Sequence, residues 1–428
     1  MPVRGLEPLL AERRLIQQAP LSALAETRIG IDVSQYLRQI LTSESTREPL
    51  IAATGGLPIA LTAHIEADLR TLDKFRIKPV FVFNGLPLYR RNPPRQAQEV
   101  ISGREAAQRN HAWALYEQGH AEEAAKVLTE GQRHGNWVVP IEVTRLILRM
   151  FRHRMVEYIV APYMQWGQLS YLLNHPKGYV HSVFSSLEML AFPTQRVITS
   201  IDFANATFRF VDRGRAIADI GLIPDQFIDF IILCGTELLP TFPPLADNFF
   251  NRSLIDMLRH FKSGAGVIAG HSEHPAVRAS GYLEGFLRTR AAIKYSLVLT
   301  AEEGTCLPLP LVIPPTQQAH AITASEVPAD IHEIFSGRLP DELYFHISKG
   351  LISPQLVGWL TSGIIHELPP LDNGESIEYR KYIENVITEG ATAPRCTALS
   401  LLTSCLNQAW QQKRIVSSRL HRVVRRKD

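Results

Sequence analysis

The sequence predicts an α/β domain, in which a mostly parallel sheet is sandwiched by helices, followed by a small helical module. In the first half of the chain, short apolar segments alternate with segments of helical periodicity, which is typical of a parallel sheet covered on both faces. After residue 245 this alternation stops, and a Pro-rich stretch then leads to a last group of predicted helices. With 45% hydrophobic and 20% charged residues, the 428-residue chain can bury a substantial core.

The first half supplies the strands of the predicted sheet. Residues 57–75 are predicted to form a covering helix, because apolar residues recur there at helical spacing. An insertion, 86–139, separates the second and third strands, and its Ala-rich centre, 104–130, is predicted to be helical. The predicted strands are 29–33, 79–83, 158–160, 179–184 and 196–201.

The second half is predicted to be helical. Two helices are expected at 248–261 and 278–296, and the module is expected to end in one long helix that carries a basic tail. Three further helices are expected in the module, at 341–349, 354–362 and 377–387. The predicted organisation is an α/β domain at 1–245 with its insertion at 86–139, a helical extension at 246–312, a linker at 313–329 and the module at 330–428.

Composition excludes some classes of protein. A net charge of +3 is too small to indicate nucleic-acid binding by itself. The four cysteines lie far apart, without the spacing of a metal site or a disulfide framework, which favours a reducing cytosolic compartment. No apolar run approaches the roughly 20 residues that span a bilayer, and the N-terminus lacks an apolar signal segment, so we expect no membrane association.

Five sequence blocks occur in a fixed order, at 28–33, 79–85, 160–172, 185–192 and 226–237. Together they resemble the blocks of the XPG and flap-endonuclease family, over roughly residues 26–245. The resemblance implies a PIN-like nuclease fold in which seven acids surround two divalent cations. Those seven positions fall here on Asp32, Asn84, Met164, Trp166, Ser186, Glu188 and Glu237.

Four of the seven positions carry neutral residues. Two-metal phosphodiester hydrolysis needs clustered carboxylates that hold two cations about 3.5–4 Å apart, and the apolar side chains of Met164 and Trp166 cannot ligate a hard cation. We therefore predict no catalytic residue, no metal and no cofactor. Asp32 is either a remnant ligand or a structural acid before a helix that Ser34 could cap, and the spacing of Met164 and Trp166 favours packing.

Two groups of arginines are candidate RNA contacts, because basic clusters neutralise phosphates. In the insertion, glutamates offset the positive charge of the arginines, so a solvated helical hairpin is the simpler interpretation there. For the basic C-terminal tail, the alternative interpretation is a solvated helix. After Glu237, the family's Gly-rich helix-hairpin-helix is replaced by a Pro-containing segment, 238–245, which removes backbone donors for a DNA phosphate. The candidate contacts are Arg90, Arg91, Arg95, Arg419, Arg422, Arg425 and Arg426.

A narrower resemblance covers most of the chain. Segments 5–13, 32–37, 81–85, 161–174, 208–213, 239–245, 343–345 and 350–352 are similar to the fungal maintenance-of-killer-toxin proteins. This resemblance implies a nuclease-like fold without nuclease activity that acts in post-transcriptional control of mRNA, in the cytoplasm, on polysomes or in granules such as P-bodies and stress granules. The implied partner is an ataxin-2-like protein that binds poly(A)-binding protein, and members of the family are typically longer than this chain.

We therefore predict a non-catalytic adaptor that presents surfaces to an RNA-regulatory partner. One alternative is a residual metal-dependent flap or RNA nuclease that uses Asp32, Glu188 and Glu237. Another is direct binding of mRNA without cleavage, through the insertion and the basic tail.

Overall fold

A computed structural model defines the fold. It describes residues 3–41, 60–86, 88, 111–134, 141–245, 251–313, 327–329, 331–335, 339–352, 354–367, 377–382, 394–406, 408–412, 414 and 416–419.

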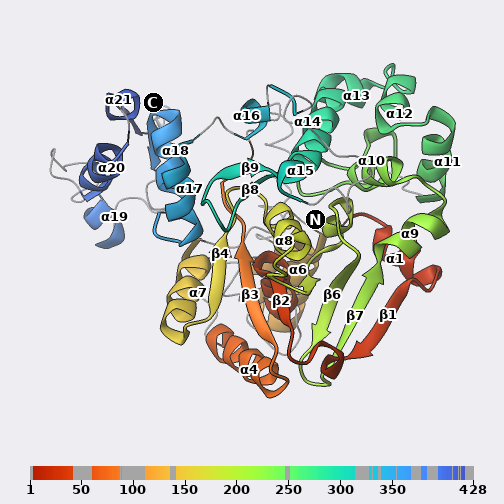
Figure 1. The fold of residues 1–428 in the computed structure, drawn as a ribbon, viewed down its shortest axis with the longest axis horizontal. Coiled ribbons are helices and arrows are strands. Elements are labelled where there is room, and N and C mark those ends of the chain that lie inside the picture. Colours follow the sequence, from red (N-terminus) through yellow and green to blue (C-terminus); the bar gives the residue numbers. More distant parts are fainter. Residues whose placement is uncertain are drawn as a thin grey trace.

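A seven-stranded sheet forms the centre of the molecule, in the order β1-β7-β6-β5-β2-β3-β4 (Figure 1). Strands β6, β5, β2, β3 and β4 are parallel, whereas β7 runs antiparallel to both β6 and β1. The predicted mostly parallel sheet is confirmed, and strands β7 and β1, which extend it beyond β6, are additions to it. The strands are β1 (Ile16–Pro20), β2 (Arg28–Asp32), β3 (Lys78–Phe83), β4 (Glu157–Val160), β5 (Ser182–Phe184), β6 (Arg196–Asp202) and β7 (Thr207–Asp212).

Helices cover both faces of this sheet. On one face, Phe81 of β3 packs against Tyr36 of α2 (Val33–Leu41) and Phe151 of α7 (Ile141–Arg154), beside α4 (Leu61–Lys74). The other face carries α8 (Gln165–Asn174). Gly30 of β2 allows α8 to approach, because a Cβ at this position would lie 2.7 Å from the Leu169 side chain.

A second group of helices packs beside the β6 and β7 side of the sheet (Figure 1). The predicted helix at 248–261 is confirmed as α11, and the predicted helix at 278–296 is confirmed as α14. These helices are α1 (Leu6–Glu12), α9 (Arg213–Ile220), α10 (Pro224–Cys234), α11 (Asn251–Phe261), α12 (Gly264–Gly270), α13 (Pro275–Ser280) and α14 (Tyr282–Lys294). The short 3₁₀ helices are η1 (Leu21–Leu24), η2 (Leu187–Ala191) and η3 (Pro243–Leu245).

The chain then forms an antiparallel pair of strands that the sequence did not predict. Strands β8 (Leu297–Leu299) and β9 (Cys306–Pro308) pair with each other and are followed by α15 (Leu309–Val312). The side-chain amide of Gln168 in α8 stabilises this pair, because it donates to the Leu299 carbonyl (3.0 Å) and accepts from the Leu299 N–H (2.9 Å).

The last part of the chain contains helices and a second small sheet. Helix α17 (Asp341–Ser348) and helix α18 (Pro354–Ser362) confirm two predicted helices, and α19 (Ile377–Tyr382) overlaps the third. Strands β10 (Ile364–Glu367) and β11 (Val416–Arg419) pair in parallel. The remaining elements are α16 (Ile331–Ile334), α20 (Pro394–Ser404) and α21 (Gln408–Gln411).

The prediction of one long final helix is wrong. Over the described residues from 394 to 419 the chain forms α20, α21 and strand β11. In the last turn of α20, the hydroxyls of Thr403 and Ser404 donate to the carbonyls of Leu399 (2.9 Å) and Leu401 (2.8 Å). Such side-chain bonds compete with the helical ladder, and the apolar stripe on which the prediction relied does not reveal them.

Helix α17 is joined to the α/β domain by polar contacts. The Tyr344 hydroxyl lies 2.9 Å from the Tyr163 hydroxyl in a buried position. The Arg152 guanidinium of α7 donates to the carbonyls of Lys349 (3.1 Å) and Gly350 (2.6 Å), just beyond the end of α17. A cation here satisfies terminal carbonyls and complements the helix dipole.

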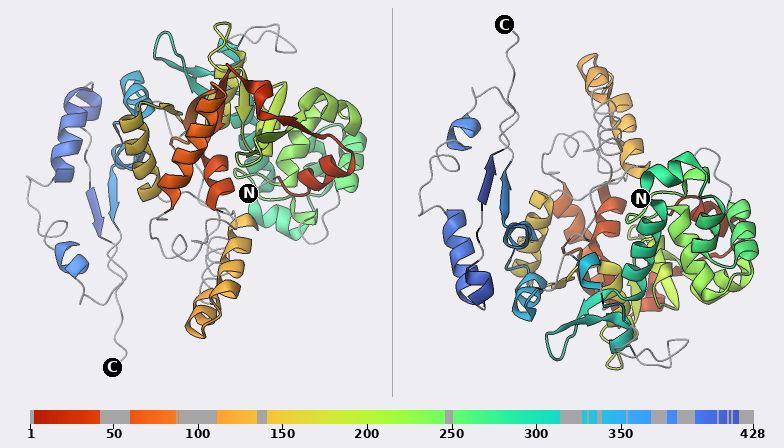
Figure 2. Two further views of the ribbon diagram at one scale, coloured as in Figure 1. Left: turned by 90° about the horizontal axis from the view of Figure 1, so that it is seen from below. Right: turned by 90° about the horizontal axis from the view of Figure 1, so that it is seen from above.

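The described part of the insertion is a helical hairpin. Residues 111–117 are helical, residues 118–120 form a turn, and α6 (Ala121–His134) follows. Both views in Figure 2 show this hairpin, in light orange, projecting from the body of the molecule. Across the described ranges, no helix has both the length and the apolar character needed to cross a bilayer.

Candidate functional site

Five of the seven predicted site positions meet in one small pocket at the carboxyl end of β2. Residues from α2 and α8, including Arg38, complete its wall. The cavity volume is about 10 Å³, close to the minimum of roughly 10–15 Å³ that holds one water molecule. The lining residues are Asp32, Ser34, Gln35, Arg38, Gln165, Trp166, Ser186, Glu188 and Glu237.

Asp32 occupies the end of β2 and is 1% exposed. Its Oδ1 accepts from the backbone N–H groups of Ser34 (3.0 Å) and Gln35 (3.3 Å), which belong to the first turn of α2. Its Oδ2 accepts from the Ser185 hydroxyl at 2.7 Å. Asp32 therefore caps α2 itself, and the expectation that Ser34 provides the cap is wrong.

Burial is the main influence on this carboxyl group. It raises the pKa of Asp32, and the negative charge of Glu237 acts in the same direction, whereas the bonds from Ser185, Gln35 and Ser34 lower the pKa. Both carboxylate oxygens already accept hydrogen bonds, so a cation at Asp32 would compete with a structural network.

Glu188 projects from η2 and is 3% exposed. Burial raises the pKa of its carboxyl group, and the charge of Glu237 adds to this, whereas hydrogen bonds from the Ser186 side chain and from its own backbone lower the pKa. Within the described residues, the buried Glu188 Oε2 has no hydrogen-bond partner, and the same holds for Oε1 of Gln165 in the same pocket. The net effect of these surroundings is a raised pKa for Glu188.

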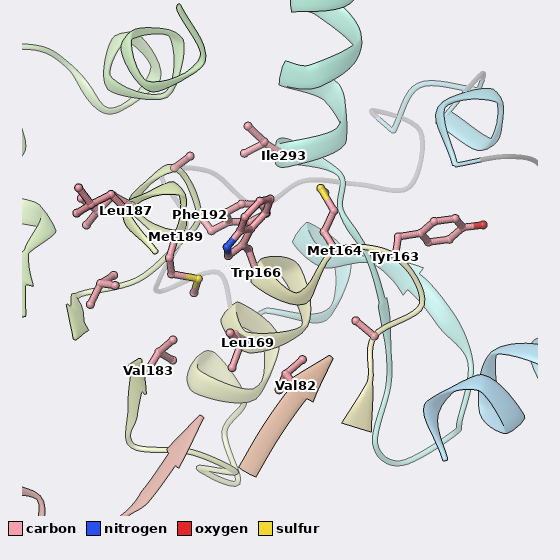
Figure 3. Packing of buried hydrophobic residues seen from close by; sticks show 14 of the residues in the cluster. Val82, Tyr163, Met164, Trp166, Leu169, Val183, Leu187, Met189, Phe192 and Ile293 are labelled. Atoms are coloured by element: carbon pink, nitrogen blue, oxygen red, sulfur yellow. The ribbon is translucent and has the colours of Figure 1, made fainter. Parts of the chain in front are cut away.

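Trp166 and Met164 have become part of the hydrophobic core. Trp166 is 4% exposed, its ring lies 6.2 Å from that of Phe192, and its indole Nε1 donates to Ser186 Oγ at 3.2 Å. Met164 is 3% exposed, and Figure 3 shows it in the packed group that includes Trp166, Phe192 and Ile293. The prediction that these two residues pack is supported by their burial.

The remaining position, Asn84, lies outside the pocket. Its side chain is exposed. The neighbouring Gly85 is constrained by close contact, because a Cβ there would lie 1.8 Å from the Ala161 carbonyl oxygen. The backbone N–H of Gly85 donates to the Tyr163 carbonyl at 2.7 Å, which fixes the loop after β3 beside α8.

The residues present do not fit a pair of divalent cations. An indole fills one ligand position, a thioether fills another, and the oxygens of Asp32 are engaged by α2 and Ser185. Magnesium requires near-octahedral oxygen ligands at about 2.0–2.1 Å, and the pocket offers space for about one water molecule. In the described part of the chain, no group of three or more His, Cys, Asp or Glu side chains is arranged to hold a metal ion.

Several pocket residues were not identified from the sequence. Ser34 and Arg38 are four residues apart on α2, immediately after Asp32, so helical spacing would have placed them together at this site. Gln165 lies between two predicted positions, and Ser185 directly precedes a third. Their roles depend on side-chain direction, which the motif blocks do not give.

The candidate RNA-contacting arginines remain predictions. Arg419 lies in β11, where only its backbone is described. The other six, Arg90, Arg91, Arg95, Arg422, Arg425 and Arg426, lie outside the described residues.

The sheet and the position of the pocket define an XPG-like, flap-endonuclease-like α/β domain. Residues 1–102 match the family model of the XPG N-terminal domain. Residues 328–420 match a second family, described as "Temperature dependent protein affecting M2 dsRNA replication".

Comparison with curated proteins shows that the chain is homologous to the fungal MKT1 post-transcriptional regulators. It is 50% identical to post-transcriptional regulator MKT1 of Cryptococcus neoformans over 415 residues, which cover 97% of the chain and 53% of that protein. With mkt1 of Schizosaccharomyces pombe the identity is 26%, covering 98% of the chain and 58% of the relative. The chain thus spans a little over half the length of these relatives.

A more distant similarity concerns the α/β domain. Flap endonuclease 1 of Ostreococcus tauri is 24% identical over 253 residues, which cover 56% of this chain and 61% of that enzyme. Together the matches place the chain in the MKT1 family and agree with its flap-endonuclease-like fold.

Proposed function

We propose that this protein is a non-catalytic scaffold in the post-transcriptional regulation of mRNA, acting on mRNA stability or translation. The observation that carries the proposal is the buried Trp166, which occupies a metal-ligand position and packs in the core. The commitment of Asp32 to capping α2 supports it.

The proposed partner is an ataxin-2-like protein that itself binds poly(A)-binding protein. This assignment rests on the resemblance to the fungal maintenance-of-killer-toxin proteins noted in the sequence. We propose that a short amphipathic helix of the partner binds in a groove of this chain, which is a common mode of peptide recognition. Such a complex would place the protein in the cytoplasm, on polysomes or in mRNP granules.

Purification of the tagged protein from cytosolic extract, with and without RNase, tests the partner. The proposal expects the ataxin-2-like protein in both samples, because a direct protein contact does not need RNA. Mixing the two purified proteins provides the second step, and no binding at micromolar concentration would remove the partner assignment. Recovery only without RNase would indicate a link through RNA instead.

One observation favours a residual nuclease as the competing function. Three acids, Asp32, Glu188 and Glu237, line the same pocket. This alternative expects cleavage of a flap substrate or single-stranded RNA in Mg²⁺ or Mn²⁺, with loss of cleavage in a Glu188→Gln/Glu237→Gln double variant. The scaffold proposal expects no difference between wild type and this variant, and metal-dependent cleavage that the variant loses would refute it.

A further inference from the structure

The helical hairpin of the insertion carries an exposed pair of aromatic side chains. Trp113 and Tyr116 are three residues apart on the first helix, so they lie on one face. Their ring centroids are 5.5 Å apart at an interplanar angle of 21°, and each side chain is 47% exposed. Two such rings side by side offer a contiguous apolar surface with a polar tip on each ring, which is suited to contact with a ligand.

The hairpin does not need these rings for its own packing. Its small core consists of Ala112 and Ala124, which are 1% and 0% exposed, with Leu115 and Val127 packed beside them. These residues come from both helices of the hairpin, and neither aromatic ring belongs to this core. The hairpin projects from the body of the molecule (Figure 2), and both aromatic side chains are exposed.

The charges nearby indicate which kind of ligand the pair would accept. Residues 111–127 contain three exposed glutamates, Glu117, Glu122 and Glu123, against one exposed lysine, Lys126, which gives a formal charge of −3 + 1 = −2 with histidines neutral. A phosphate backbone would be repelled by this charge, whereas a cationic group would be attracted.

We propose that Trp113 and Tyr116, with the neighbouring glutamates, form a docking face for an arginine-rich peptide segment of a protein partner. A guanidinium group stacks on an aromatic face and also forms paired hydrogen bonds with carboxylates, which suits it better than a lysine ammonium. The glutamates supply the carboxylates. This inference goes beyond the proposed function and holds whether or not the ataxin-2-like partner binds.

Fluorescence anisotropy with a labelled Arg-Gly-Gly repeat peptide tests the docking face in the full chain. We expect Trp113→Ala and Tyr116→Ala each to weaken binding about fivefold, the size of one exposed cation–π contact. Trp113→Phe should restore part of the affinity. Glu122→Lys/Glu123→Lys should weaken binding by at least as much as either alanine variant and reduce its salt dependence.

A matched control is Phe345→Ala, which removes an aromatic side chain of similar exposure, 45%, from α17. It should leave peptide affinity unchanged. The same peptide with lysines in place of arginines should bind more weakly. Equal affinity of wild type and both alanine variants for the arginine peptide would overturn the proposal. It would also be overturned if an oligo(A) RNA bound this face and Glu122→Lys/Glu123→Lys strengthened that binding, because base stacking would then explain the aromatic pair.

Discussion

Replacing Asp32 distinguishes a structural acid from a remnant metal ligand. Asp32→Ala removes the acceptor for two backbone N–H groups of α2, at 3.0 and 3.3 Å, and for the Ser185 hydroxyl, at 2.7 Å. Loss of a helix cap costs about 1 kcal/mol, and a buried donor left without an acceptor costs about 1–3 kcal/mol. Removal of a buried charge offsets part of this, so we expect a net loss of roughly 2–3 kcal/mol of unfolding free energy.

Asp32→Asn should cost less, about 1 kcal/mol or below. The amide oxygen still accepts from the N–H groups of α2, and the amide nitrogen can donate to Ser185 Oγ. If Asp32 is instead a metal ligand, the two variants should not differ in this way. Asp32→Asn and Asp32→Ala would then both abolish metal binding, and the unfolding free energy need not change in either.

Chemical denaturation at neutral pH measures the three proteins side by side. Asn84→Ala is the matched control, because Asn84 is another of the seven positions but is exposed; its change should stay within about 0.5 kcal/mol. The reasoning is refuted if Asp32→Ala unfolds within about 0.5 kcal/mol of wild type, or if Asn costs as much as Ala.

Three further predictions follow from burial. Trp166→Ala should lose about 3–5 kcal/mol of unfolding free energy, because Trp166 is 4% exposed. Its control, Trp113→Ala at a 47% exposed position, should change the unfolding free energy by less than about 0.5 kcal/mol. Equal losses for the two variants in chemical denaturation would contradict this prediction. Burial raises the pKa of the Glu188 carboxyl group from its usual 4.5, so the stability that this group contributes is present below pH 4.5 and is lost as the pH rises through the folded-state pKa. The Glu188→Gln variant, followed by chemical denaturation from acidic to neutral pH, should lose this pH dependence of stability and be at least as stable as wild type at neutral pH. Burial raises the pKa of Asp68 to about 6, and the bond from the Tyr36 hydroxyl lowers it; Tyr36→Phe should therefore move the carboxyl titration, followed by NMR, to higher pH, and a shift downward would show that this bond does not favour the ionised form.

The parallel core of the sheet was predictable because its strands are buried on both faces. Strand β3 contains the apolar run Val80–Phe83, and β2 contains the buried Ile29 and Ile31; the predicted and observed bounds of both strands differ by one residue at most. Strand β1 was missed because its sequence, Ile-Gln-Gln-Ala-Pro, is half-buried to exposed and lacks an apolar run. It forms by pairing with β7, whose residues lie some 190 positions further along the chain. No local sequence pattern predicts a pairing between strands so far apart.

The pocket, like the sheet, could be predicted from the sequence only in part. Motif order placed five of seven positions in one pocket, since strand ends of a parallel sheet share an edge. Motif order could not show that Asn84 is exposed or that Arg38 enters the pocket. Those outcomes depend on the direction of individual side chains, which is set by tertiary packing.

Counting acids is a poor test of metal binding in a fold of this kind, because a carboxylate binds a cation only if its oxygens are available. Asp32 holds the start of α2 to β2 and, through Ser185, to the end of β5. Both of its oxygens already accept hydrogen bonds, from Ser34, Gln35 and Ser185. Glu188 differs from Asp32 in that its Oε2 has no hydrogen-bond partner among the described residues. Burial raises the pKa of both carboxyl groups, so protonation competes with a cation at each of them. The presence of acids at these two predicted ligand positions therefore does not by itself indicate a cation site.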